Sequence, residues 1–319
     1  MASPPRRPLL ARLTHNTCED KKRPVDLSIV IVNYNTRNLL RDCLCSVYAS
    51  QGDFQYEVIV VDNCSPDGSV EMVQQEFPQA KLIASEINGG YAYANNLGLR
   101  LAQGDYVLLL NPDTVLPPTA LRDMLAFMEE HPDAGVAGPK LVLADGSLDW
   151  ACRRSFPTLD VAFYRLVGLS KRYPNSPRYN RYNLGYLDPD QVAEVDSVVG
   201  AFMLIRREAL DQVGFLDEGF FAYAEDIDLC YRIKVDHGWK VYYNPAVVVK
   251  HYKGQSTRQR AMAMNIEFYR AMWLFHKKHF AQRTFFLLNW ATALGIVGLC
   301  CLALSINFLR PPEKRKVGL

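Results

Sequence analysis

The run at residues 219–232 gathers three carboxylates, Glu225, Asp226 and Asp228, within four positions and places them among aromatic and aliphatic residues. Acids crowded together in partly apolar surroundings repel one another and resist desolvation. We therefore expect at least one of their pKa values to rise toward the value that suits a general base. The alternative is a helix N-terminus, in which Glu225 and Asp226 complement the dipole of a helix over residues 227–237.

A second acidic element follows an apolar run at residues 106–110, which is too short for a typical helix and ends abruptly at Asn111-Pro112-Asp113. The run predicts a buried strand whose carboxyl end presents Asp113. Ligands of open α/β sheets collect outside the carboxyl ends of the strands. An aspartate there can hold a hard divalent cation while substrate phosphates complete its shell. An ordinary turn or helix cap before Pro117 and Pro118 is the other interpretation.

The strands that lead up to this element share one pattern. The sequences LSIVIVNYN at residues 27–35 and YEVIVVDN at residues 56–63 are β-branched runs that end in polar residues, which predicts two strands. Apolar residues at helical spacing predict a helix over residues 36–50, and a weaker pattern predicts another over residues 69–77. Strands that alternate with short helices imply right-handed parallel crossovers, so we expect a doubly wound, mostly parallel sheet.

Two further segments could contact a nucleotide. Asp62 ends the second predicted strand, where it could accept a hydrogen bond from a nucleobase or a ribose hydroxyl, or simply cap the turn at residues 65–68. Residues 88–98 begin as a glycine-rich loop and continue into a predicted helix, whose free N–H groups could approach a diphosphate. A plain helix cap fits the same residues, because no complete dinucleotide fingerprint or P-loop is present.

Taken in order, these motifs resemble those of the family-2 inverting glycosyltransferases. The motifs are LSIVIVNYN, VVDN, NGGYAYANN, LLLNPD, VVGAFMLIRREAL, FFAYAEDIDLCYR and the late His251. The chain resembles the rhamnosyltransferase-like branch of that family between residues 27 and 255, and the specificity rests on the ordered set. The resemblance implies a GT-A fold, which is an α/β, Rossmann-like, mostly parallel sheet with flanking helices.

The resemblance also implies roles for single residues. Asp62 would bind the base or the ribose, and Asn111 and Asp113 stand where the family has its Asp-x-Asp. Because Asn111 adds no negative charge, binding of Mg²⁺ or Mn²⁺ would depend on Asp113 and on the diphosphate itself. His251 would reach the metal or the diphosphate, although by itself it reads as an ordinary surface or packing residue. The other residues expected at the donor are Asn33, Tyr34, Asn88, Gly89 and Asn96, and Gly200 and Ala201 are expected to border the acceptor.

Inverting glycosyl transfer asks two things of these residues. A nucleotide diphosphate must leave, and a cation at Asp113, helped by His251 and by Lys253 or Arg258, would stabilise the charge that grows on it. An acceptor hydroxyl must lose its proton as it attacks the anomeric carbon from the opposite face. Asp226 is the predicted base and Glu225 the predicted positioning residue. Asp228 would point elsewhere if a helix starts here, so it is the predicted structural acid.

Composition agrees with one large α/β domain and an accessory portion, since 319 residues with 49% hydrophobic content can bury a core. We expect a disordered basic tail at residues 1–25, a nucleotide-sugar-binding half at 26–115, an acceptor-binding half at 116–275 and a basic-flanked segment at 276–319.

The eight cysteines form no Cys-x-x-Cys pair, which favours reduced thiols and a cytosolic compartment. No basic stripe interleaved with aromatics argues for nucleic acid. Residues 164–186, with little periodicity, predict a long loop over substrate.

The C-terminal segment predicts a membrane location. Residues 285–309 contain no charge, and as a helix they would reach roughly 37 Å, more than the ~30 Å hydrocarbon layer. A buried or oligomerising helix is the alternative. Basic residues flank both ends, so charge leaves two topologies open, a single span or a re-entrant hairpin that bends near residues 295–298. Nucleotide sugars are cytosolic donors, so we expect the catalytic domain on the cytoplasmic face of the cell membrane.

The sequence thus predicts an inverting, metal-dependent glycosyltransferase for cell-surface polysaccharide synthesis, acting on a glycan or lipid-linked acceptor. The resemblance favours dTDP-rhamnose as donor, and UDP-hexoses remain open. A sugar nucleotidyltransferase is one alternative, but no glycine- and basic-rich activation loop follows the first predicted strand. A catalytically inactive, membrane-attached nucleotide-sugar-binding module is another, yet the pair Glu225 and Asp226 is intact.

Overall fold

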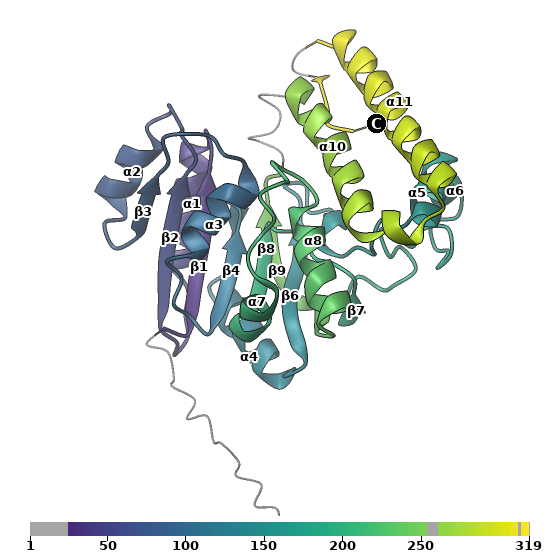
Figure 1. Ribbon diagram of the computed structural model, residues 1–319. Coiled ribbons are helices and arrows are strands. Elements are labelled where there is room, and N and C mark those ends of the chain that lie inside the picture. Colours follow the sequence, from purple (N-terminus) through teal and green to yellow (C-terminus); the bar gives the residue numbers. More distant parts are fainter. Residues whose placement is uncertain (1–24, 254–260, 312–313, 319) are drawn as a thin grey trace, which may run out of the picture.

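The computed structural model describes residues 25–253, 261–311 and 314–318. The predicted basic tail therefore lies almost wholly outside the described residues, and Arg258 lies outside them as well. The described chain folds into an α/β domain with a helical hairpin on one side (Figure 1).

One mixed sheet holds the core. In the described residues it has nine strands in the order β3-β2-β1-β4-β8-β6-β9-β5, and β7 also pairs with β9. The strand bounds are β1 Leu27–Asn33, β2 Tyr56–Asp62, β3 Lys81–Ala84, β4 Tyr106–Leu110, β5 Thr114–Val115, β6 Ala134–Val142, β7 Ala193–Val195, β8 Phe202–Arg206 and β9 Lys240–His251.

The first half of the sheet is parallel, as the β-branched runs predict. Every residue of β1 is buried, and β1 pairs in parallel with β2 on one side and β4 on the other. This register places Asn33 opposite Asp62. The carboxyl ends of β1, β2 and β4 therefore lie at one edge of the sheet, where ligands of such sheets bind.

Helices cover the sheet. Their bounds are α1 Arg37–Tyr48, α2 Ser69–Glu76, α3 Tyr91–Leu99, α4 Ala120–Glu130, α5 Leu159–Leu166, α6 Leu169–Arg172, α7 Arg207–Val213, α8 Glu225–Tyr231, α10 Ala261–His279 and α11 Phe286–Phe308. The small residues of α3 allow it to lie very close to the strands. A Cβ at Gly98 would stand 2.5 Å from a methyl carbon of Val30, so α3 could not hold this position with a larger residue there.

Two expectations about the second half need correction. The predicted loop over residues 164–186 contains the end of α5 and all of α6, because helices of eight and four residues are too short to show a clear apolar period. The helix predicted over residues 227–237 begins instead at Glu225 and continues as a π-helix over Arg232–Asp236.

Pairing between strands that are distant in the sequence brings His251 to the carboxyl edge of the sheet. Strand β8 runs antiparallel to β4, and β5 pairs antiparallel with the end of β9, which places Thr114 opposite His251. Asp113 and His251 thereby become neighbours although they lie far apart in the sequence.

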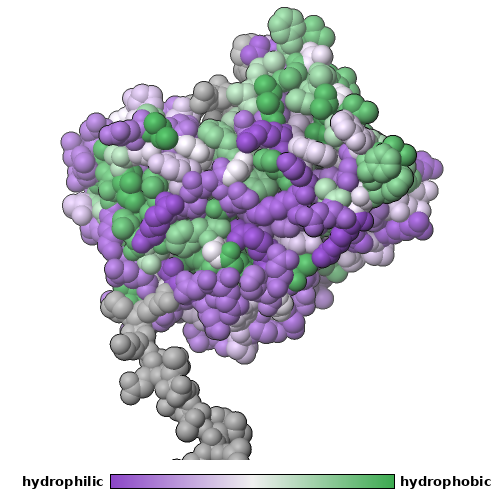
Figure 2. Space-filling view, in the orientation of Figure 1, coloured by the Kyte–Doolittle hydropathy of each residue, from purple (hydrophilic) through white to green (hydrophobic). Residues whose placement is uncertain are grey.

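The C-terminal helices α10 and α11 form an antiparallel hairpin (Figure 1). Among the described residues, α11 is the one helix long and apolar enough to cross a bilayer, and 6% of its most apolar window is buried. Hydrophobic residues gather on the part of the surface where α11 lies (Figure 2). The helix runs unbroken through residues 295–298, so the bend that the re-entrant alternative would need is absent here.

Candidate active site

The loops that carry Asp113 and Asp226 meet on the two sides of Gly200-Ala201. The backbone N–H of Asn111 donates to the carbonyl of Ala201 at 3.0 Å. The backbone N–H of Gly200 donates to Oδ2 of Asp226 at 3.1 Å. The carboxyl edge of the sheet and the loop that carries Asp226 are therefore both hydrogen-bonded to one short backbone segment.

Tyr91, the first residue of α3, contacts the same backbone segment. Its hydroxyl donates to the carbonyl of Gly200 at 2.9 Å. Burial raises the pKa of Tyr91 well above its usual value, and the negative charges of Glu225, Asp226 and Asp113 add to the effect. The pKa of one side chain is thus shifted by both acidic elements, as expected if they border a common cleft.

Asp226 is an ion-paired carboxylate. Its Oδ2 accepts from the guanidinium of Arg154 at 2.7 Å, and its Oδ1 accepts from the backbone N–H of Ile227 at 2.7 Å. With the bond from Gly200, three of roughly four acceptor positions of the carboxylate are used. The side chain is 8% exposed, so room for one further donor remains on the side that reaches solvent.

Glu225 behaves differently from its neighbour. It is buried, and its Oε2 has no hydrogen-bond partner in the part of the chain that the structure describes. Burial, reinforced by the negative charge of Asp226, raises the pKa of Glu225 to about 8. The expected rise in the acidic run therefore falls on Glu225, where burial and the neighbouring negative charge favour the protonated carboxyl.

Unusual backbone geometry presents this acid pair. Tyr223 and Ala224 both have left-handed φ angles, 69° and 64°, although neither is glycine. Ala224 is the N-cap residue of α8, and Glu225 and Asp226 form its first turn. The helix-start interpretation is thus correct as geometry, and it does not exclude a site at the same residues. Strain of this kind persists where the surroundings fix it, and it is common at functional sites.

The glycine-rich loop packs directly against the segment before the acids. The N–H of Tyr91 donates to the carbonyl of Phe221 at 2.7 Å. Gly90 has a φ of +91°, and a Cβ there would stand 2.3 Å from the same carbonyl oxygen. Only glycine allows the two loops to come this close.

The predicted metal residues form a polar cluster at the end of β4. Nε2 of His251 lies 3.3 Å from Oδ1 of Asp113, and Nδ1 lies 3.0 Å from Oδ2 of Asp149. Burial by itself lowers the pKa of His251, but the carboxylates of Asp113 and Asp149 outweigh it and raise the value to about 9. Lys253 also contacts Asp149, at 2.6 Å. Burial opposes ionisation of Asp149, but the hydrogen bonds from His251 and Lys253 prevail and lower its pKa.

This cluster fits a divalent cation that is shared with a diphosphate. The side-chain Oδ1 atoms of Asn111 and Asp113 are both buried, and neither has a well-directed hydrogen bond to any described residue. An imidazole oriented through its other nitrogen by a carboxylate, as Asp149 orients His251, is the usual arrangement of a metal-binding histidine. The described ranges hold no complete group of three or more metal-ligating side chains, so phosphate oxygens would have to complete the shell.

A second polar group lies at the ends of β1 and β2. Asp62 is buried and accepts from the amide of Asn33 at 2.8 Å and from the N–H of Ser65 at 2.8 Å. The amide oxygen of Asn33 in turn accepts from the hydroxyl of Thr36 at 2.7 Å. Asp62 thus also caps the following turn, the alternative that the sequence left open. Tyr34 is half-buried beside this group.

The predicted donor loop is held by a residue that the sequence reading missed. The amide of Asn63 donates to Oδ1 of Asn88 at 3.0 Å and accepts from the N–H of Gly89 at 3.1 Å. Asn96 lies elsewhere, and its amide exchanges hydrogen bonds with the backbone of Leu216 at 2.9 and 3.1 Å. Its hydrogen-bonding groups are thus committed to positioning the segment before the acidic run.

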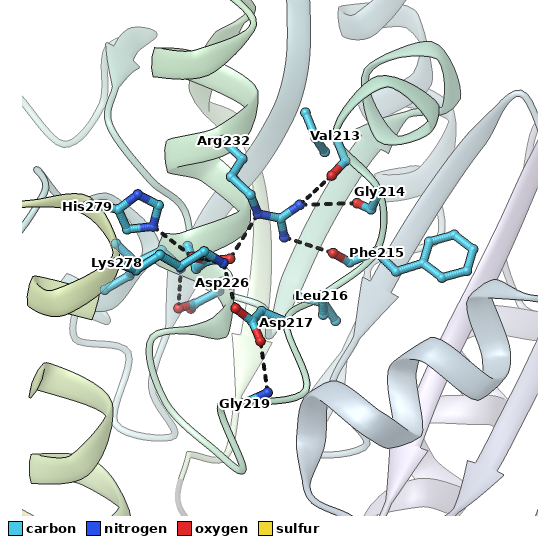
Figure 3. Close-up of polar contacts among 12 residues, drawn as sticks. Val213, Gly214, Phe215, Leu216, Asp217, Gly219, Asp226, Arg232, Lys278 and His279 are labelled. Carbon is cyan, nitrogen blue, oxygen red and sulfur yellow. Dashed lines mark hydrogen bonds and ion pairs between the residues drawn. The ribbon is translucent and has the colours of Figure 1, made fainter. Parts of the chain in front are cut away.

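Asp228 is held in a network of cationic side chains, as expected of a structural acid. It is fully buried, and its carboxylate contacts Arg232 at 2.9 Å, Lys278 at 2.8 Å and His279 at 2.7 Å. Figure 3 shows the guanidinium of Arg232 turned toward backbone carbonyls of the loop after α7, and Lys278 reaching Asp217. This network joins α8 to the end of α10.

Arg154 and Asp149, like Asn63, are residues around the site that the sequence did not reveal. Both come from the segment between β6 and α5, which carries no strong pattern. A single arginine or aspartate in a loop gives no signal by itself, because its partners lie 72 and 102 residues away.

The model of glycosyl transferase family 2 matches residues 28–214. Over 242 residues the chain is 31% identical to the N-acetylglucosaminyl-diphospho-decaprenol L-rhamnosyltransferase of Mycobacterium tuberculosis, covering 72% of this chain and 77% of that protein. It is 28% identical over 242 residues to the rhamnosyltransferase WbbL of Escherichia coli, covering 72% of this chain and 84% of that protein.

The fold is similar to that of solved glycosyltransferases. One is the mannosyltransferase PcManGT from Pyrobaculum calidifontis in complex with GDP-Man and Mn²⁺, with a TM-score of 0.53 and 18% identity, over 92% of this chain and 78% of that chain. This likeness bears on the fold, and it confirms the predicted α/β architecture.

Proposed function

This chain belongs to glycosyltransferase family 2, and we propose that it moves rhamnose from a nucleotide-diphosphate donor to a hydroxyl group of a lipid-linked glycan. The product would serve cell-surface polysaccharide synthesis, and transfer with inversion fits the family. The observation that carries the proposal is the convergence of Asp113 and the pair Glu225 and Asp226 on the two sides of Gly200-Ala201.

The choice of rhamnose is supported by the two relatives, both of which are named as rhamnosyltransferases. We propose dTDP-rhamnose as the donor. The Mycobacterium tuberculosis relative is named for an acceptor that carries a diphospho-decaprenol group. A lipid-linked acceptor is therefore the first to test, before a free glycan.

We propose that Asp113 and His251 hold Mg²⁺ or Mn²⁺ and that Asn111 assists through its free amide oxygen. Bound there, the cation would stabilise the charge that develops on the departing diphosphate. Asp149 keeps the imidazole of His251 oriented, and Lys253 adds a positive charge beside it. These residues would thus favour departure of the nucleotide.

We propose Asp226 as the base. It is the ion-paired member of the pair, it has an acceptor position left, and it is anchored by Arg154 and by the backbone of Gly200. It would take the proton of the acceptor hydroxyl as the new bond forms. Glu225, with a pKa of about 8, would instead donate a hydrogen bond and position the acceptor. Two acids in different surroundings can divide such roles.

For the donor we propose contacts from Asn33, Tyr34, Asp62, Asn88 and Gly89. Asn96 is left out of this set because its amide is committed to Leu216. Gly200 and Ala201 border the proposed acceptor position, and their backbone bonds hold the two acidic elements at a fixed separation.

We further propose that the donor half comprises residues 26–115 and the acceptor half residues 116–275. The helix α11 would attach the enzyme to the cell membrane, with the catalytic domain on the cytoplasmic face. Its length and apolar character support attachment.

Release of nucleoside diphosphate tests this function. The full-length protein is incubated with dTDP-rhamnose, UDP-glucose and UDP-N-acetylglucosamine, each with and without a lipid-linked N-acetylglucosaminyl diphosphate. We expect acceptor-dependent release from dTDP-rhamnose. Release without transfer to the lipid, or release of inorganic pyrophosphate from a sugar phosphate and a nucleoside triphosphate, would contradict the proposal.

A further inference from the structure

The exposed surface of α11 is strongly apolar along its whole length. The side chains that are between 48% and 83% exposed are Phe285, Phe286, Leu287, Leu288, Trp290, Leu294, Val297, Leu302, Phe308 and Leu309. Soluble surfaces rarely present so much contiguous apolar area. Figures 1 and 2 place this surface on the side of the hairpin that faces away from the sheet.

The first end of α11 is fixed to the catalytic domain. Nε2 of His276, near the end of α10, lies 2.7 Å from Oδ1 of Asn289 in the first turn of α11. His279 of α10 contacts Asp228 at 2.7 Å and packs at a tilt against the ring of Tyr231 of α8, with ring centroids 4.0 Å apart. The beginning of α11 therefore stays beside α8.

The far end of α11 is fixed to the beginning of α10. The carbonyl of Lys316 accepts from the amides of both Asn265 and Asn307, at 2.8 and 2.7 Å. The N–H of Gly318 donates to Asn265 at 2.9 Å, and that of Lys316 donates to Asn307 at 3.0 Å. Both asparagines are buried, so breaking this clamp would leave polar groups without partners.

Helix α10 cannot follow α11 across a bilayer. It carries Glu267 and Arg270 in its middle, and a charged group at the centre of a membrane costs about 2.5–3.5 kcal/mol even on the mildest scale. Its Phe268 also packs edge-on against Tyr223, beside the acid pair, with ring centroids 5.4 Å apart. α10 thus belongs to the catalytic domain.

We infer that α11 lies in the plane of the membrane, inserted into one leaflet of an anionic bilayer, with both of its ends on the side that carries the active site. If α11 crossed the bilayer while α10 stayed outside it, the far end of this 23-residue helix would lie about 34 Å from the membrane face that holds α10, and Asn307 would be pulled away from Asn265. This inference rests on the membrane attachment that we proposed above and specifies its geometry.

The charges around α11 indicate which lipids it meets. Lys277 and Arg283 stand before the helix, and Lys314 and Lys316 follow it, all of them exposed. In the sequence from residue 280 to residue 319, Glu313 is the single acid. Basic groups at both ends of an in-plane helix match a leaflet rich in anionic headgroups, each adding about 1 kcal/mol near the surface.

The location of the C-terminus tests the topology. An epitope is placed after Leu319, the full-length protein is bound to preformed sealed vesicles of equal phosphatidylglycerol and phosphatidylcholine, and protease is added outside. We expect complete cleavage of the epitope without detergent. Protection until detergent is added would mean that α11 crosses, and would overturn the inference.

Depth along the helix gives an independent measurement that does not depend on the epitope. Single tryptophans at 290, at 297 (Val297→Trp) and at 308 (Phe308→Trp) are quenched with lipids brominated at defined depths, with the other tryptophans replaced by Phe. An in-plane helix predicts nearly equal depths at the three positions. A maximum depth at 297 with shallow ends would contradict it.

Lipid composition tests the charge argument. Lys314→Gln with Lys316→Gln is expected to weaken binding to the phosphatidylglycerol vesicles about 5-fold per residue and to leave binding to pure phosphatidylcholine unchanged. Equal binding to both vesicles by the unaltered protein would contradict the anionic preference. A stable dimer that buries α11 and does not bind vesicles would overturn the inference, because a second copy of the chain would then cover the apolar surface. None of these readouts needs donor or acceptor, so they fail or succeed separately from the transferase activity.

Discussion

Glu225 gives the account its sharpest stability test. In the folded protein its pKa is raised to about 8, first by burial and then by the charge of Asp226, against an ordinary value of 4.5. Between these two values the folded state keeps a proton that the unfolded state has lost. Because the unfolded state binds fewer protons across this window, stability must fall as pH rises through it.

The size of the effect follows from the same two values. A fully developed difference of one bound proton changes the free energy of unfolding by about 1.4 kcal/mol per pH unit. Between pH 5.5 and 7.5, both inside the window, Glu225 should therefore cost the fold about 2 to 3 kcal/mol. Glu225→Gln has nearly the same shape and no titration, so it should remove this loss.

The assay is chemical denaturation of the full-length protein in one detergent at several pH values, followed by fluorescence. The quantity of interest is the difference between the variant and the unaltered chain, since the titrating groups outside the pair Glu225 and Asp226 are common to both. Glu208→Gln is the matched control, because Glu208 is exposed on α7. A difference between Glu225→Gln and the unaltered chain that stays constant from pH 5.5 to 7.5 would refute the reasoning.

Three further predictions concern the surroundings of the acid pair. Arg154→Met should destabilise the fold by about 3–5 kcal/mol, since it leaves the buried carboxylate of Asp226 without its partner; a cost below 1 kcal/mol in denaturation would contradict the burial. Gly90→Ala should lower the free energy of unfolding by more than about 1 kcal/mol and weaken donor binding measured by calorimetry, because its Cβ would stand 2.3 Å from a backbone carbonyl oxygen. Gly68→Ala is the control and should lower the free energy of unfolding less, because its Cβ would meet nothing closer than 3.8 Å. Asp113→Ala should abolish Mn²⁺ binding in the presence of dTDP, measured by electron paramagnetic resonance. In the unaltered protein, sugar transfer should stop on chelation and resume when Mg²⁺ or Mn²⁺ is added. Full activity after exhaustive chelation would mean that Asp113 does not bind a catalytic metal.

The parallel half of the sheet could be predicted because its information is local. The strands β1, β2 and β4 are buried on both faces, so β-branched and aliphatic residues run without interruption and end at polar residues. The same logic predicted which acids stand at the carboxyl edge. The helix α11 was equally clear, because a long uncharged run has few other meanings.

What could not be predicted depends on pairing between distant segments. The antiparallel β5–β9 contact that joins Asp113 to His251, and the reach of Arg154 to Asp226, leave no local pattern. Crowding in the acidic run predicted that a pKa would rise, but only the buried environment decides that the affected residue is Glu225.

The topology of α11 shows the same limit. Flanking charges left the spanning and re-entrant arrangements open, and the bend that a re-entrant hairpin would need at residues 295–298 is absent. What favours the in-plane arrangement that we propose is a clamp between Asn265 and Asn307, two ordinary asparagines whose shared partner is a backbone carbonyl. Backbone partners of this kind are invisible in a single sequence.

The central claim is that Asp226 acts on an acceptor while Asp113 serves the donor across one cleft. It is tested most directly by acceptor-dependent release of dTDP from dTDP-rhamnose by Asp226→Asn, with donor affinity measured in parallel by calorimetry. If Asp226 is the base, turnover falls by a factor on the order of 10²–10⁴ while donor affinity stays nearly unchanged. Turnover that survives the substitution, or donor affinity that falls by as much as turnover, would contradict it.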